Sequence, residues 1–382
     1  MFTPNQYFSY NLNSLPKGCQ YCVRGEKLVL FVTGLCPRKC YFCPLSDKKY
    51  GQDIIYANER IISAGENAEA EILEEAHSMR AKGAGITGGD PLMKLDRTVS
   101  YIKLLKEKFG VRFHIHLYTS LDLVTEESLK KLFEAGLDEI RFHPDLDNQK
   151  FWTRIDLAKK FSWDIGVEIP LVPNKEKEIQ QLIDLIKDKV KFLNMNELET
   201  ADNEHSKLSE LGFCTIDNMS YAIKDSLTMG LNLLEYAQKA NPELEVNLCT
   251  AKLKDAVQLA NRLKRQAKFA KKDFDVVDEE GLFTRGALYL DELKPGMNYH
   301  KELEKAEKSR ILYRLKPLFE EVKSKLRLHE REIYLDNKKL RILISRKMLE
   351  KNTKELKEIG LVPAIVKEYP TADQLEIEVR FV

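Results

Sequence analysis

Short apolar segments alternate with helical segments between residues 27 and 250, and this alternation constrains the fold more than any other feature of the chain. Seven strands are expected, at Lys27–Thr33, Gly85–Thr87, Arg112–Tyr118, Glu139–Phe142, Ile165–Val172, Val190–Met195 and Glu245–Cys249. Helices are expected between them, near residues 64–81, 99–109, 125–134, 149–161, 176–187 and 227–240. Strands that alternate with helices pair in parallel through right-handed crossovers. The sequence therefore predicts an α/β fold containing a full or partial (β/α) barrel of parallel strands.

The pattern changes after Cys249. A long basic helix is expected at Lys252–Lys272, and an acidic stretch of low periodicity follows it. From about Ser309 the order is helix, strand pair, helix and two strands, which predicts a small α+β domain. We expect four parts: an N-terminal segment at 1–26, the barrel at 27–272, a linker or extension at 273–308, and the small domain at 309–382.

Charge and hydropathy exclude some classes of protein. The 61 Lys and Arg residues nearly cancel the 60 Asp and Glu residues, so the net charge of +1 gives no overall attraction to nucleic acid or to a membrane. Leu28–Val32 is the longest apolar run near the start, far short of the roughly 20 residues that span a bilayer. No signal peptide is expected, and seven cysteines then suit a reducing, cytoplasmic location where thiols bind metal or take part in catalysis.

Three cysteines follow the first strand directly. Cys36, Cys40 and Cys43 are separated by three and then two residues, and Gly34 precedes them. Three thiolates from one loop can bind three irons of a 4Fe–4S cluster and leave the fourth iron open to a small molecule. A structural zinc site competes with this interpretation, but it needs four ligands, and no further cysteine follows before Cys214. In a barrel, the loop after a strand is where active sites lie.

This spacing, with Phe42 as the aromatic residue before the last cysteine, resembles the signature of the radical S-adenosylmethionine superfamily. The resemblance covers roughly residues 27–250. It implies a (β/α) barrel, a 4Fe–4S cluster on Cys36, Cys40 and Cys43, and S-adenosylmethionine bound to the open iron. It also implies an oxidoreductase in which a low-potential electron donor reduces the cluster. Cleavage of S-adenosylmethionine then gives a 5′-deoxyadenosyl radical that abstracts hydrogen from a substrate.

A second motif follows the second strand, and it reads Thr87, Gly88, Gly89, Asp90 and Pro91. It is similar to the family's Gly-Gly-Glu-Pro, which implies contact with the methionine amino group, although Asp90 is one methylene shorter than glutamate. Bare glycines let a backbone approach a ligand closely. The overlapping G-x-G-x-x-G run at 83–88 is typical of a dinucleotide site only when it follows a strand and opens a helix. Here its middle lies within a strand, which argues against that interpretation.

Later strands end in polar residues. Arg141 and His143 lie two apart on the fourth strand and so share a face, and Glu168 lies on the fifth. By resemblance, these strands supply contacts to the carboxylate, ribose and adenine of S-adenosylmethionine. The plainer alternative is that such residues are satisfied core or surface groups. His114 and His116 also share a face of the third strand, and they are expected to line the barrel rather than to bind metal.

Cys19 and Cys22 form a C-x-x-C-x-x-G run that resembles a metal-binding knuckle. Together with Cys214 and Cys249 they could form a four-thiolate site for zinc or an auxiliary iron–sulfur cluster. However, Cys22 precedes the first strand and Cys249 ends the seventh, which places them near opposite ends of the barrel. A pair of reduced structural thiols is the alternative.

The basic helix suggests an anionic substrate. Arg262, Arg265 and neighbouring lysines could bind the phosphates of RNA, a nucleotide, a cofactor precursor or a phosphorylated metabolite, unless the helix face is merely solvated. The Phe31-x-x-Gly34-x-Cys36 lead-in is loosely similar to that of pyruvate formate-lyase activating enzymes, which make a glycyl radical on a partner protein. A metal-binding adaptor without catalysis is an alternative of another class. The sequence identifies neither the substrate nor any residue with a catalytic role, and no membrane partner is expected.

Overall fold

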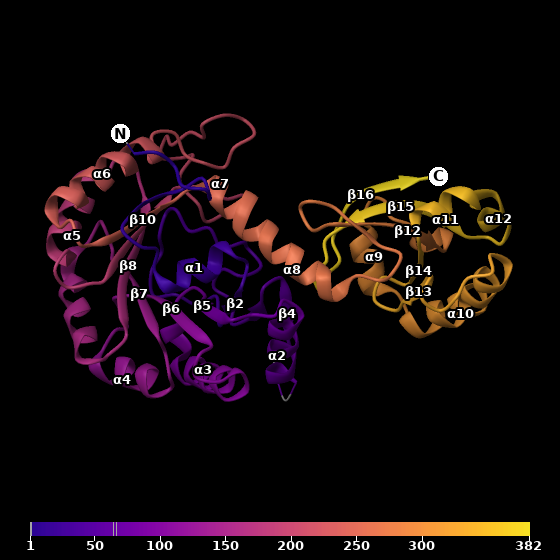
Figure 1. Cartoon of the computed structure of the whole chain (residues 1–382), viewed down its shortest axis with the longest axis horizontal. Coiled ribbons are helices and arrows are strands. Elements are labelled where there is room, and N and C mark those ends of the chain that lie inside the picture. The colour runs from indigo at the N-terminus through magenta and orange to yellow at the C-terminus, as the bar shows by residue number, and fades with distance from the viewer. Residues whose placement is uncertain (1, 64, 66) are drawn as a thin grey trace. The chain divides into compact units, whose positions relative to one another are not determined.

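A computed structural model describes residues 2–63, 65 and 67–382 of the chain. The chain divides into two compact units, Met1–Arg262 and Leu263–Val382, and we describe each by itself (Figure 1). Among the described residues, no helix is long and apolar enough to cross a membrane.

The first unit contains a ten-stranded sheet with the order β1-β10-β9-β8-β7-β6-β5-β2-β3-β4. Its seven central strands pair in parallel, and they confirm the seven strands expected from the sequence. They are β2 (Lys27–Phe31), β5 (Gly83–Thr87), β6 (His114–Ser120), β7 (Glu139–His143), β8 (Asp164–Leu171), β9 (Phe192–Glu197) and β10 (Glu245–Cys249). Antiparallel strands β1 (Tyr10–Leu12), β3 (Ile55–Ala57) and β4 (Arg60–Ile62) extend the two edges. Among the described residues no pairing joins β1 to β4, so the barrel is partial.

Helices cover the outer face of this sheet (Figure 1). They are α2 (Ala68–Ser78), α3 (Leu95–Phe109), α4 (Glu126–Glu134), the 3-10 helix η2 (Gln149–Lys160), α5 (Glu176–Ile186) and α6 (Ser226–Ala240). The expected start of the first helix, Ala64, lies outside the described residues. At α4 the hydroxyl of Thr125 accepts a hydrogen bond from the Ser128 amide at 3.1 Å, as the threonine before the helix predicts.

Apolar and polar side chains alternate along the barrel strands and therefore lie on opposite faces of the sheet. Leu28, Ile115, Leu117 and Ile140 are fully buried in the core that the strands share with the helices. Neighbouring positions carry polar residues that contact one another inside the barrel, because successive side chains of a strand point to opposite faces. These are Lys27, His114, His116, Tyr118, Glu139, Arg141 and Glu168. The barrel interior is therefore polar and available for chemistry.

The N-terminal segment closes the amino end of the barrel strands. Helix α1 (Lys17–Val23) contacts β2, β5 and β6, and the Gly18 amide donates a hydrogen bond of 3.0 Å to Glu139, the first residue of β7. A Cβ on Gly18 would lie 2.4 Å from an Arg141 nitrogen, so a larger residue would displace the buried Arg141 side chain. The segment is thus part of the floor of the barrel rather than a separate appendage.

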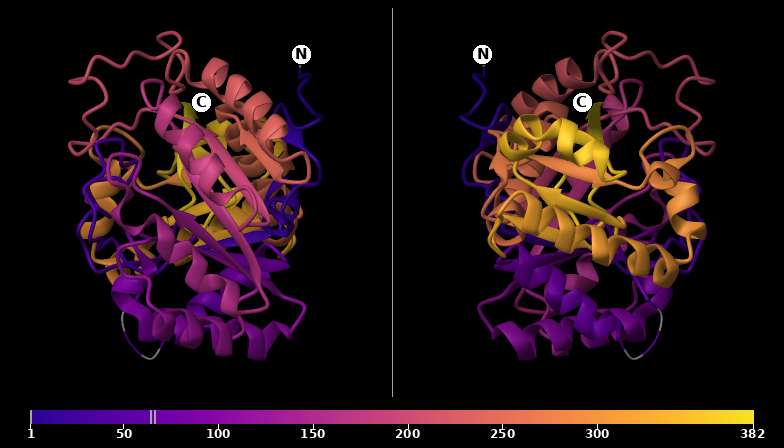
Figure 2. Two further views of the ribbon diagram at one scale, coloured as in Figure 1. Left: turned by 90° about the vertical axis from the view of Figure 1, so that its left-hand side faces the viewer. Right: turned by 90° about the vertical axis from the view of Figure 1, so that its right-hand side faces the viewer.

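The second unit is a small α+β domain with an antiparallel sheet in the order β13-β14-β12-β15-β16, to which β11 adds beside β12. The strands are β11 (Val276–Val277), β12 (Phe283–Tyr289), β13 (Ile333–Asp336), β14 (Arg341–Ile344), β15 (Val362–Glu368) and β16 (Glu376–Phe381). Its helices include α9 (Tyr299–Lys305), α10 (Lys308–Lys325), α11 (Arg346–Lys351) and α12 (Thr353–Glu358). Figure 2 shows helices of this unit, in orange and yellow, against the strands.

Two ranges differ from the expected boundaries. Residues 273–308, expected as a linker or extension, supply β12, which lies at the centre of the second sheet because both its edges are paired. The expected helix Lys252–Lys272 consists of α7 (Ala251–Leu253), a π-helical turn η3 (Lys254–Leu259) and α8 (Ala260–Ala270), and the boundary between the units falls within α8.

Candidate active site

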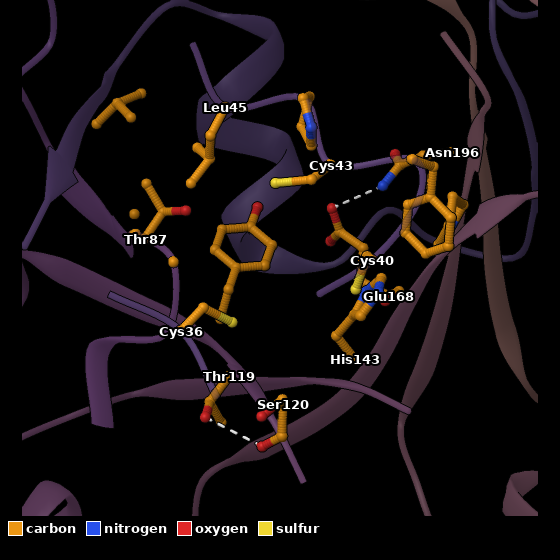
Figure 3. A pocket seen from close by; sticks show the side chains of 18 of the residues that line it. Cys36, Cys40, Cys43, Leu45, Thr87, Thr119, Ser120, His143, Glu168 and Asn196 are labelled. Atoms are coloured by element: carbon orange, nitrogen blue, oxygen red, sulfur yellow. Dashed lines mark hydrogen bonds between the residues drawn. The ribbon is translucent and has the colours of Figure 1, made fainter. Parts of the chain in front are cut away.

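A cavity of about 570 Å³ opens at the carboxyl ends of the barrel strands (Figure 3). The loop after β2 forms one side of it, and the ends of β5, β6, β7, β8 and β9 form others. This is the end of a parallel barrel where loops after strands converge and where active sites are expected.

Cys36, Cys40 and Cys43 all line this cavity as free thiols. In Figure 3 their sulfur atoms border one hollow. Burial raises the pKa of Cys36 to about 11, and it also raises the pKa values of Cys40 and Cys43. The thiols therefore keep their protons until a metal displaces them. Among the described residues no three side chains form a ready site for a single metal ion, and a four-iron cluster requires thiolates spaced more widely than the ligands of one ion.

Close backbone packing fixes the cysteine loop. The Gly34 amide donates to the carbonyl of Gln52 at 2.8 Å, and a Cβ on Gly34 would lie 1.7 Å from the carbonyl oxygen of Lys49. Farther along, the Arg38 guanidinium donates to the carbonyl of His143 at 2.9 Å and pairs with Asp145 at 3.3 Å. The loop is thus held at both its start and its middle.

The Gly-Gly-Asp-Pro motif supports the same loop. The amides of Gly89 and Asp90 donate to the carbonyls of Thr33 and Leu35, at 2.7 and 2.8 Å. A Cβ on Gly88 would lie 2.5 Å from the Thr33 carbonyl oxygen, and one on Gly89 would lie 2.3 Å from that of Leu35. The glycines therefore let two protein backbones approach each other. Thr87, Gly88 and Gly89 still line the cavity.

The Asp90 side chain lies behind the cavity wall. Its side chain is fully buried, and its carboxylate accepts hydrogen bonds from the Leu92 amide at 3.0 Å, from the Thr119 hydroxyl at 2.8 Å, and from the Ser120 amide and hydroxyl at 3.0 and 2.6 Å. Burial raises the pKa of this carboxyl although these donors lower it. The shorter side chain turns into the protein, and neither Asp90 nor Pro91 is among the residues that line the cavity. Thr119 and Ser120 are, and Figure 3 shows both at the cavity wall.

Arg141, His143 and Glu168 lie together, as their positions on neighbouring strands predict. Arg141 is 3% exposed and donates to Glu139 at 2.6 Å and to Glu168 at 2.8 Å. Glu168 also accepts hydrogen bonds from Asn194 at 2.8 Å and Asn196 at 3.0 Å. The charge of Glu168 is thus balanced, while its side chain and that of Asn196 face the cavity (Figure 3).

His143 joins the cavity wall to the cysteine loop. Its Nδ1 lies 2.9 Å from the carbonyl oxygen of Glu168, and its ring lies 6.1 Å from that of Phe42. Burial lowers the pKa of His143 to about 4, so the imidazole is neutral at physiological pH. Phe42 itself lines the cavity and packs against a small apolar cluster built on Val172 and Leu198.

The four remaining cysteines do not form one metal site among the described residues, although Cys249 packs beside Val23 of α1, contrary to the expectation that Cys22 and Cys249 lie near opposite ends of the barrel. Cys19 and Cys22 lie within helix α1 rather than in a tight knuckle, with Cys19 buried beside Arg141 and Cys22 on the cavity wall. Cys249 is buried against Val23, whereas Cys214 is exposed. Different environments for the four thiols give no support to a second metal site, because such a site needs ligands that converge.

Both arginines of the basic helix already interact with other residues of the protein. Arg262 pairs with Glu59, and its side chain is 12% exposed. Arg265 belongs to the other unit and likewise has a partner. The guanidinium of Arg262 is therefore already paired and is not free to bind a phosphate. The sequence did not predict this pairing because Glu59 and Arg262 are far apart in the chain.

A long segment between β9 and α6, which the sequence did not single out, contacts the cysteine loop. The side-chain amide of Asn203 donates to the carbonyls of Cys43 and Leu45, at 3.0 and 2.9 Å. The ring of His205 stacks on Tyr50 at 3.7 Å. Connections longer than about 12–15 residues are uncommon and often functional, and that length was the available signal.

Residues 30–186 match the family model of the Radical SAM superfamily. Together with a relative that is similar over nearly the whole chain, this match shows that the protein belongs to the radical S-adenosylmethionine superfamily. The relative is a protein of Methanocaldococcus jannaschii (strain ATCC 43067) named "Putative glycyl-radical enzyme activating enzyme MJ0021". It is 39% identical over 382 residues, which cover 98% of this chain and 94% of the relative.

Two solved structures have similar folds. The crystal structure of HydG, a maturase of the FeFe-hydrogenase, is 13% identical with a TM-score of 0.39, covering 68% of this chain and 69% of that chain. Methylornithine synthase (PylB) is 15% identical with a TM-score of 0.38, covering 63% of this chain and 80% of that chain. At these scores neither likeness carries an argument about activity.

Membership of the superfamily makes the protein an enzyme that uses a 4Fe–4S cluster and S-adenosylmethionine. The alternative of a non-catalytic adaptor is therefore wrong. Cys36, Cys40 and Cys43 are suitable ligands for such a cluster, because all three line the cavity and none forms a disulfide.

Proposed function

We propose that this enzyme activates a glycyl-radical protein by removing a hydrogen atom from a glycine of that partner. The observation that carries the proposal is the 39% identity to a relative named as an activating enzyme of this kind, over 98% of the chain. The loosely similar lead-in from Phe31 to Cys36 supports it. The anionic substrates expected from the basic helix receive no such support.

In this proposal Cys36, Cys40 and Cys43 hold the cluster, which leaves one iron for the methionine part of S-adenosylmethionine. A reduced cluster held by these cysteines would supply the single electron needed to cleave the sulfonium of S-adenosylmethionine, and that cleavage would yield methionine and a carbon radical able to abstract hydrogen. Thr87, Gly88 and Ser120 line the same cavity as the cysteines. Their backbone and hydroxyl groups are available to the methionine part of S-adenosylmethionine.

The chain's own residues orient the rest of the cofactor. Glu168 and Asn196 hydrogen-bond to each other at 3.0 Å and present polar atoms to the cavity, as ribose hydroxyls require. Arg141 holds Glu168 in place from behind, through its contact of 2.8 Å. We propose His143 and Phe42 as the wall against which the adenine packs.

The test uses uniformly deuterated cell extract, separated into protein, RNA and small molecules. Each fraction is incubated anaerobically with the reconstituted enzyme, S-adenosylmethionine and a strong reductant, and deuterium in the 5′-deoxyadenosine product is measured. The proposal predicts transfer from the protein fraction, and from protein labelled only at glycine. Transfer from the RNA or small-molecule fraction alone would contradict it. A matched reaction with unlabelled fractions sets the background.

A further inference from the structure

The cavity continues below the cysteine loop into the barrel. Its inner end, which we name the inner chamber, is lined by Cys22, Lys27, Val29, Gly85, His116 and Tyr118. Strand register sets the depth, because Val29 pairs with Gly85, and Gly85 pairs with His116, at a level nearer the amino end of the strands than Thr87. Val29, Gly85 and His116 therefore lie deeper in the barrel than Thr87, whereas Tyr118, which follows the Ile86–Leu117 pair, lies at the level of Thr87.

His116 has an unusual environment within this chamber. Its side chain is 3% exposed, and its Nδ1 has no hydrogen-bond partner among the described residues. Nδ1 lies against Gly18 of α1, where an added Cβ would be 2.7 Å away, and Nε2 lies against Gly85 of the chamber wall, where an added Cβ would also be 2.7 Å away. Burial lowers the pKa of His116 well below its ordinary value, so the ring is neutral and has one donor and one acceptor nitrogen.

Tyr118 lies beside it on the same face of β6, with the two ring centroids 5.1 Å apart. The phenol oxygen accepts a hydrogen bond from Arg141 at 3.0 Å. Burial raises the pKa of Tyr118 well above its ordinary value, so the phenol keeps its hydrogen. That hydrogen remains available to donate to a group in the chamber.

The cationic side chains that line the cavity already have acceptors. Among the described residues these are Lys27, which donates to the carbonyl of His114 at 2.7 Å, Arg38, which donates to that of His143 at 2.9 Å, and Lys254, which pairs with Glu199. A phosphate or carboxylate in the chamber would find no unpaired cation. Burying an uncompensated charge is costly, whereas a neutral polar group needs only hydrogen bonds.

We propose that the inner chamber binds a neutral peptide group of the substrate and that His116 and Tyr118 recognise it. A peptide group has one N–H donor and one carbonyl acceptor, which complements a neutral imidazole and a phenol hydrogen. The inference rests on the proposed function and names the part of the partner that enters the site. The C–H bond of the glycine α-carbon breaks, a C–H bond forms in 5′-deoxyadenosine, and the α-carbon keeps the unpaired electron.

The experiment uses three probes that carry deuterium on the glycine α-carbon. They are a nine-residue peptide with a central glycine, N-acetylglycine N-methylamide, and the anionic N-acetylglycine. The cluster-loaded enzyme is incubated with each probe, S-adenosylmethionine and reductant, and the deuterium transferred per 5′-deoxyadenosine formed is measured. Wild type, His116→Leu, Tyr118→Phe and the exposed-site control His329→Leu are compared, with thermal unfolding as a check of folding.

Both neutral probes should transfer deuterium, and N-acetylglycine should not. The ratio should fall about tenfold in Tyr118→Phe and at least as far in His116→Leu, as for the loss of one hydrogen bond to a buried group. His329→Leu should behave as wild type.

Transfer from the peptide alone would mean that the chamber accepts a peptide group only within a longer polypeptide. Transfer from both neutral probes would mean that it accepts any accessible peptide group. Transfer from the anionic probe, no transfer from any probe, or equal ratios in all variants would overturn the inference while leaving S-adenosylmethionine cleavage intact. Absence of 5′-deoxyadenosine altogether would remove the proposed function as well.

Discussion

The hydroxyl of Ser120 donates a hydrogen bond of 2.6 Å to the carboxylate of Asp90, in the interior of the barrel. Asp90 thereby fixes a residue of the cavity wall without lining the cavity itself. Through these hydrogen bonds and those of its backbone, the Gly-Gly-Asp-Pro motif braces β5, β6 and the cysteine loop against one another. The first prediction follows from this brace.

Asp90→Asn should lower the free energy of unfolding of the metal-free protein by about 2–4 kcal/mol. An amide cannot accept all of the hydrogen bonds that the carboxylate accepts, and buried donors would be left unsatisfied. Urea denaturation measures the change, with the exposed Asp202→Asn as control. A loss below about 0.5 kcal/mol, the range of ordinary surface substitutions, would show that Asp90 does not brace the fold.

Gly89→Ala should reduce the iron bound after anaerobic reconstitution by more than half. The added Cβ would lie 2.3 Å from the Leu35 carbonyl oxygen, so the backbone that leads to Cys36 must shift. Iron and sulfide analysis measures the effect. Gly296→Ala is the matched control, because a Cβ there meets nothing within 4 Å. Full cluster content in Gly89→Ala would contradict the packing role given to this glycine.

Lys27 should make the metal-free protein more stable as the pH rises from about 7 to 9. Burial lowers the pKa of Lys27 to about 7 in the folded protein, whereas the unfolded chain holds the proton up to about 10.5. The unfolded state therefore binds more protons in this window, and the lysine contributes up to about 1.4 kcal/mol of stability per pH unit. Denaturation midpoints at several pH values test this. Lys27→Met should flatten the dependence, and an unchanged slope would contradict it.

Glu168→Gln should weaken binding of S-adenosylmethionine about tenfold with the iron content retained. The substitution removes the charge that pairs with Arg141 and disturbs the hydrogen bond to Asn196, while the cysteine loop is untouched. Equilibrium dialysis with the reconstituted protein measures the affinity. Glu235→Gln, on the exposed face of α6, is the control. Equal affinities for Glu168→Gln and wild type would exclude Glu168 from the cofactor site.

Much of the fold follows from local pattern, because the seven parallel strands are short apolar runs bounded by glycines and helix caps. The cysteine site follows as well, since spacing alone places three thiols on one loop. The pairing of Arg262 with Glu59 does not follow, because it joins residues far apart in the chain. The inward turn of Asp90 depends on Thr119 and Ser120, donors from another strand. Likewise, β12 is a central strand only because β14 and β15, much later in sequence, pair with it.

The most direct test of the central claim is the amount of 5′-deoxyadenosine that the reduced, reconstituted enzyme forms from S-adenosylmethionine. The account predicts 5′-deoxyadenosine and methionine in equal amounts from the wild-type protein. It predicts neither product from a Cys36→Ala, Cys40→Ala, Cys43→Ala triple variant, which should also lack the cluster. Retention of cleavage by the triple variant, or no cleavage by wild type with an intact cluster, would contradict the assignment of these three cysteines.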